Sequence, residues 1–112
     1  MSSLTGIVYP AVAGEQHAFT ATTTVIAAPG SGLRLFVSRV VVSWSATSDR
    51  VVLVQGSGGT TQLIECAAAN GPVEVDFGDF GFALPANEAL EASVVSGAAG
   101  DVTVSAIARI AR

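Results

Sequence analysis

The stretch LRLFVSRVVVSWSA at residues 33–46 decides the fold class. Its apolar side chains fall on both sides of an extended chain: Leu33, Leu35, Val37 and Val41 on one side, and Phe36, Val40, Val42 and Trp44 on the other. Successive side chains of a β-strand point to opposite faces, so this alternation predicts a strand. Because both faces carry apolar residues, we expect it to be covered on both sides.

Six further segments have the same period of two or a β-branched composition, and they lie at 17–27, 50–55, 61–66, 73–77, 89–96 and 102–110. Turn-forming residues separate the segments, at 29–32, 56–59, 70–72, 84–87 and 97–100. No long stretch has helical period. This spacing predicts one all-β domain, an antiparallel sandwich or barrel.

The first sixteen residues differ from the rest. They are apolar enough to pack, but Pro10 and the glycines at positions 6 and 14 weaken them as a core strand. We therefore expect an extended N-terminal arm over residues 1–16 and a β-sandwich domain over residues 17–112. The arm residues expected to form an interface, with the domain itself or with a neighbouring subunit, are Leu4, Ile7, Val8 and Tyr9.

Composition excludes several classes of protein. Half of the 112 residues are hydrophobic and 12% are charged, which is the opposite of a disordered chain. The net charge is −4, lysine is lacking, and the five arginines stand singly, so we expect no nucleic-acid partner. The longest apolar runs are far too short to span a bilayer, so we expect no membrane partner. The N-terminal residues show no secretory signal, so we expect synthesis in a cytoplasm.

The residues that could carry catalysis are few. His17 is the one histidine and Cys66 the one cysteine, and no G-x-S-x-G pattern occurs. We interpret His17 as a surface or interface residue and Cys66 as a buried thiol. The glycine-rich segment 56–59 is interpreted as a hairpin turn, and Asp79-Phe80-Gly81 as a chance match to a kinase tripeptide. We therefore expect no enzyme activity, no catalytic residues and no cofactor.

Three carboxylates lie close together at Glu74, Asp76 and Asp79. Such a cluster is compatible with Ca²⁺, which prefers oxygen ligands. We favour a solvated strand face, or an arginine partner across a subunit boundary, and expect no metal.

Three stretches carry a resemblance to a known class: VVVSWSATSDRVVLVQGSGGTT at 40–61, VEVDFGDFGFALPANEALEASVVS at 73–96 and VTVSAIAR at 102–109. The chain from Arg39 to Arg112 resembles the small jelly-roll or β-sandwich virion proteins of tailed bacteriophages, most of all head decoration (cement) proteins. The corner FALPANEAL at 82–90 precedes the last hairpin in such proteins.

The resemblance implies a jelly-roll-like sandwich that stabilises the capsid shell as a homotrimer on the capsid surface. Its partners would be the major capsid protein and other copies of itself. The arm would dock on the shell, while four aromatic residues would fill the core or a subunit seam: Trp44, Phe77, Phe80 and Phe82. A tail, baseplate or head-fibre component, and a carbohydrate- or Ca²⁺-dependent adhesion module, are the alternatives.

The low charge also concerns the sheet edges, which proteins often protect with lysines. Here we expect the protection to come from glycine and proline turns, from carboxylates such as Glu74 and Asp76, and from other subunits. Much of the surface is thus expected to be interface.

Overall fold

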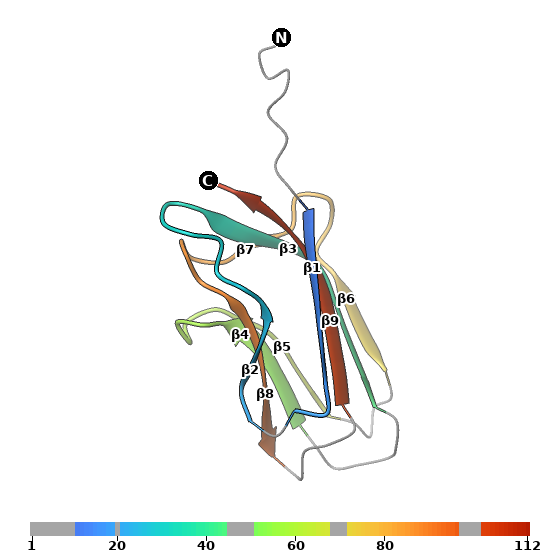
Figure 1. Ribbon diagram of the computed structural model, residues 1–112. Helices are drawn as coiled ribbons and strands as arrows, with labels where there is room; N and C mark the ends of the chain where they lie inside the picture. The colour runs from blue at the N-terminus through green and yellow to red at the C-terminus, as the bar shows by residue number, and fades with distance from the viewer. Residues whose placement is uncertain (1–10, 20, 45–50, 68–71, 97–101) are drawn as a thin grey trace.

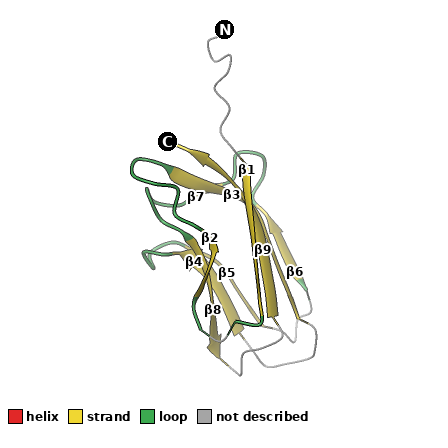
Figure 2. Cartoon of the chain, viewed as in Figure 1, coloured by secondary structure: helices red, strands yellow, loops and turns green. Residues whose placement is uncertain are grey.

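The computed structural model describes residues 11–19, 21–44, 51–67, 72–96 and 102–112. Within these residues it consists of strands and loops (Figure 2). The strands are β1 (Ala11–His17), β2 (Thr23–Ile26), β3 (Arg34–Trp44), β4 (Val51–Gly56), β5 (Gln62–Ala67), β6 (Val73–Asp76), β7 (Phe82–Ala83), β8 (Leu90–Ser96) and β9 (Val102–Ala111). The all-β prediction is confirmed.

The strands form two antiparallel sheets packed as a sandwich (Figure 1). The first sheet has the order β1-β9-β3-β6, with β7 also pairing with β3, and the second has the order β2-β8-β4-β5. Valine and leucine side chains from the two inner faces fill the space between the sheets. The largest fully buried ones are Leu35, Leu84, Leu90, Val37, Val40, Val42, Val52, Val54, Val102 and Val104.

A β-bulge in the longest strand changes the prediction that this strand is covered on both faces. The register of β3 against β9 shifts between Val37 and Arg39, so one extra residue, Ser38, is inserted there. One inserted residue moves every later side chain of the strand to the opposite face from the one that the alternation before the bulge would give it. Leu35 and Val37 point inward before the bulge, as do Val40 and Val42 after it. Leu35 and Val37 of one apolar stripe and Val40 and Val42 of the other therefore share one buried face. Phe36 and Val41 stand on the opposite, outer face and are half-buried.

The strand β1 moves the boundary expected between arm and domain. Residues 11–17 pair along their whole length with β9, so residues 11–16 belong to the sandwich, and residues 1–10 lie outside the described residues. Gly14, expected from the sequence to weaken a strand, lies where β1 crosses the edge of β2. A Cβ atom there would stand 1.7 Å from the carbonyl oxygen of Val25. The Gln16 Nε2 amide donates a hydrogen bond to the Thr24 carbonyl oxygen at 3.0 Å, which joins the two edges.

The strand expected over 17–27 is in fact two strand segments in different sheets. The chain leaves β1 at Ala18, whose φ is 50°, and whose N–H donates to the Val102 carbonyl oxygen at 2.8 Å. It enters the second sheet at Thr23. An alanine in the left-handed region is uncommon, so the sequence carries no turn signal at this point.

The corner at residues 84–89 carries the chain from the first sheet to the second. Asn87 has a φ of 56°, and its N–H donates to the Leu33 carbonyl oxygen at 2.7 Å. Its Oδ1 atom accepts a hydrogen bond from the Gly30 N–H at 3.0 Å. The β4–β5 hairpin, confirmed at the glycine-rich segment 56–59, also contacts this corner, because Ser57 Oγ accepts from the Ala89 N–H at 3.0 Å.

Candidate interaction surfaces

The outer face of the first sheet presents three cross-strand rows of side chains. Strand pairing places them as Glu15, Ser105, Val41 and Glu74; then Ala13, Ile107, Arg39 and Asp76; then Ala11, Arg109, Phe36 and Ala83. Alanine and serine alternate here with larger side chains. The first two rows therefore enclose a hollow rather than a flat surface.

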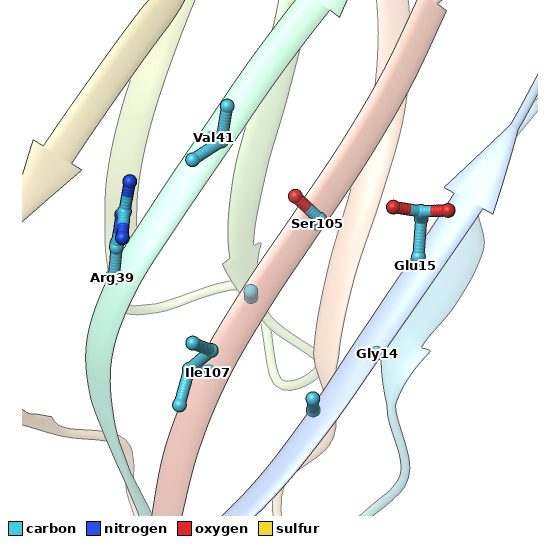
Figure 3. A pocket seen from close by; sticks show the side chains of 8 residues that line it. Gly14, Glu15, Arg39, Val41, Ser105 and Ile107 are labelled. Carbon is cyan, nitrogen blue, oxygen red and sulfur yellow. The ribbon is translucent and has the colours of Figure 1, made fainter.

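This hollow, which we call the sheet depression, has a volume of about 510 Å³ and is lined by residues of β1, β9 and β3 (Figure 3). Its lining is Ala13, Gly14, Glu15, Arg39, Val41, Ser105, Ala106 and Ile107. Ile107 is 45% exposed although it stands on a strand paired on both sides. An apolar floor with polar groups at its margin is typical of a binding surface.

An ion pair and a histidine–carboxylate contact lie near the depression. The Arg39 guanidinium forms an ion pair with the Glu74 carboxylate on β6. On the β1 side, His17 Nε2 lies 2.7 Å from the Glu15 carboxylate, and His17 Nδ1 lies 3.0 Å from Thr103 Oγ1. His17 is exposed, which agrees with the interpretation as a surface histidine.

The acidic cluster of the sequence is divided in the structure. Glu74 and Asp76 share the exposed face of the edge strand β6, as predicted, and the arginine partner of Glu74 belongs to the same chain. Asp76 Oδ1 accepts a hydrogen bond from the Gly78 N–H at 2.7 Å. Across the described residues, no three His, Cys, Asp or Glu side chains are grouped as a metal site would require.

A second surface feature projects from the β6/β7 edge. Residues 76–81, which we call the aromatic turn, leave the line of the edge strand opposite the β3 bulge, where the Phe77 N–H donates to the Ser38 carbonyl oxygen at 2.7 Å. The Gly81 N–H donates to the Gly78 carbonyl oxygen at 3.2 Å and closes the turn. Both glycines have positive φ, 87° at Gly78 and 77° at Gly81. Two backbone hydrogen bonds and two glycines in the left-handed region therefore define the turn.

The aromatic turn presents Phe80, which is 83% exposed, beside the exposed carboxylate of Asp79. Phe77 packs against the core, and its ring centroid lies 5.8 Å from that of Phe82, which is 43% exposed. The four aromatic residues expected to fill the core or a subunit seam therefore do not share one environment. Phe77 and Trp44 pack against the core, whereas Phe80 is exposed to solvent.

Sequence reasoning missed both surface features. The depression depends on which strands pair, and the sequence alone does not show that. The aromatic turn contains Asp79-Phe80-Gly81, which we interpret from the sequence only as a chance match to a kinase tripeptide. The glycines at positions 78 and 81 were the available signal, because residues that tolerate positive φ mark turns. The arm residues predicted as an interface, Leu4, Ile7, Val8 and Tyr9, lie outside the described residues.

Cys66 lies on β5, where it is half-buried and packs against the core, close to the prediction of a buried thiol. Desolvation by burial raises the pKa of this thiol above its usual 9.0. We expect iodoacetamide at pH 8 to alkylate Cys66 more slowly in the folded protein than in urea, because the thiolate is the reactive form. Equal rates in the two states would contradict this assignment.

The same shift has a consequence for stability. The unfolded chain binds the thiol proton less tightly than the folded protein does. The contribution of the thiol proton to the free energy of unfolding is therefore fully present below pH 9.0, and it is lost as the pH rises through the folded pKa. A Cys66→Ser variant, which lacks this titration, is the control in urea melts between pH 7 and pH 10.

Within the described residues, no helix has the length and apolar character needed to cross a membrane. A scan against protein-family models finds no match, and a search of curated proteins also finds none.

Two solved structures are similar to the sandwich. The Drosophila NLP core, described for pentamer formation and histone binding, matches with a TM-score of 0.52 and 11% identity over 91% of this chain and 98% of its own. A chain of the cyanophage Pam1 capsid asymmetric unit matches with a TM-score of 0.50 and 15% identity over 93% of this chain and 87% of its own. At such identities the similarity establishes a shared fold.

Proposed function

We propose that this chain is a non-enzymatic structural protein of a bacteriophage virion, and that it decorates the capsid surface as a homotrimer. The observation that carries the proposal is the sandwich fold shared over most of both chains with a protein of the Pam1 capsid. The sequence resemblance to decoration proteins supports the same role independently of that comparison.

The exposed surface supports an assembly role. The sheet depression exposes Ile107 and the aromatic turn exposes Phe80, and large exposed apolar side chains are candidate contact points in an assembly. Both similar structures come from assemblies, one described for pentamer formation and the other a capsid. We propose the major capsid protein and further copies of this chain as partners, with synthesis in the host cytoplasm.

The geometry favours this role over Ca²⁺-dependent adhesion. Glu74 is neutralised by Arg39, and Asp76 accepts a hydrogen bond from its own turn, so two of the three carboxylates already have partners. Calorimetric titration with Ca²⁺ tests the alternative, and we expect no heat of binding.

Immunogold electron microscopy of virions tests the proposed location. We expect label on the head, and we expect purified protein to raise the temperature at which stripped, expanded capsids disrupt. Label on the tail or baseplate would favour the other virion role. Unlabelled virions, with capsids that do not bind the protein, would overturn the proposal.

A further inference from the structure

The aromatic turn offers an exposed apolar side chain, and the sheet depression offers a partly apolar hollow. Phe80 is a large apolar side chain held in solvent by a closed turn, and the depression is an apolar hollow of about 510 Å³ on the outer face of the same sheet. Because backbone hydrogen bonds already define the turn, docking of Phe80 would order little further backbone, and large aromatic side chains are common interface anchors.

The two features do not meet within one chain. Asp76, where the aromatic turn begins, pairs with Arg39 at the margin of the depression, but Phe80 remains 83% exposed. Phe80 therefore does not fill the depression of its own chain, and the depression of a second copy is available to it.

The charges complement each other as well. Asp79 stands next to Phe80 at the tip of the turn, and Arg109 stands two residues from Ile107 on the same outer face of β9. Residues two apart on a strand are separated by roughly 7 Å, within reach of an arginine side chain. Neither Asp79 nor Arg109 forms an ion pair with another described residue.

We propose that the aromatic turn of one copy docks in the sheet depression of a second copy, with Phe80 against Ile107 and Asp79 paired with Arg109. The inference rests on the proposed function in one respect, namely that copies of this chain associate with one another. It joins two different surfaces, and such contacts either close into rings or continue as filaments unless they are made reciprocally in a dimer.

Sedimentation equilibrium of the purified chain tests the contact in solution, without capsids. We expect wild type to self-associate and Phe80→Ser to raise the dissociation constant about 30-fold or more, as for a buried aromatic anchor. Ile107→Glu should act in the same direction from the other surface. Val95→Ser is the matched control, because Val95 is 49% exposed on β8 of the second sheet, and we expect its association to equal that of wild type.

A charge exchange tests the pairing itself. Asp79→Arg and Arg109→Asp should each weaken association, and the double variant should regain most of the loss, because it restores an opposite pair between copies. Circular dichroism checks that every variant is folded.

Three results would each overturn the inference: a wild type that stays monomeric at millimolar concentration, association unchanged by Phe80→Ser, or a double charge variant no better than the single ones. Binding to capsids is measured separately, so a failure of this contact leaves the capsid test of the proposed function intact.

Discussion

Gly14→Ala is expected to lower the free energy of unfolding by about 3 kcal/mol and the melting temperature by roughly 10–15 °C. The added Cβ would lie 1.7 Å from the Val25 carbonyl oxygen and 2.7 Å from the Val25 carbonyl carbon. Backbone atoms cannot rotate away as a side chain can, so β1 and β2 must separate. The separation also strains the hydrogen bond from Gln16 to Thr24.

Urea and thermal melts followed by circular dichroism measure this effect. Gly59→Ala is the control, because Gly59 has a φ of 79° and a Cβ added there would meet no atom within 4 Å, so it reports backbone strain alone. We expect the control to cost about 1 kcal/mol. Equal losses in the two variants would contradict the close approach of β1 to β2.

The fold class could be predicted because period-two alternation depends only on neighbouring residues. The bulge was also encoded, since apolar positions change parity between Val37 and Val40, but the same pattern fits a strand buried on both faces. Only pairing with β9 distinguishes these two explanations. Similarly, Gly14 is unfavourable in a strand taken alone and is required once β2 lies against it.

The candidate surfaces were less predictable, because they depend on contacts between distant segments. The partner of Glu74 was expected across a subunit boundary, whereas the pairing of β3 with β6 brings Arg39 to it in the same chain. The turn at Ala18 has no residue type that signals it. The exposure of Phe80 follows from the turn closed between Gly78 and Gly81, which its hydrophobic character alone would not predict.

Leu84→Ala is expected to cost about 3 kcal/mol, within the range for a fully buried leucine. Leu84 has no exposed surface and stands at the corner where the chain passes from the first sheet to the second. Its N–H donates to the Leu35 carbonyl oxygen at 2.9 Å, so the backbone is held in place and cannot collapse fully into the cavity. The loss should appear as a lower urea midpoint with an unchanged slope.

Leu53→Ala is the control, because it shows how much stability the same substitution costs outside the core. Leu53 lies on the outer face of β4, opposite Glu65 and Ser93, and is half-buried, so we expect Leu53→Ala to cost less than about 1 kcal/mol. If the two variants lost equal stability, the corner would not be part of the core. If Leu84→Ala alone is destabilised, the corner at residues 84–89 is a packing element that joins the two sheets.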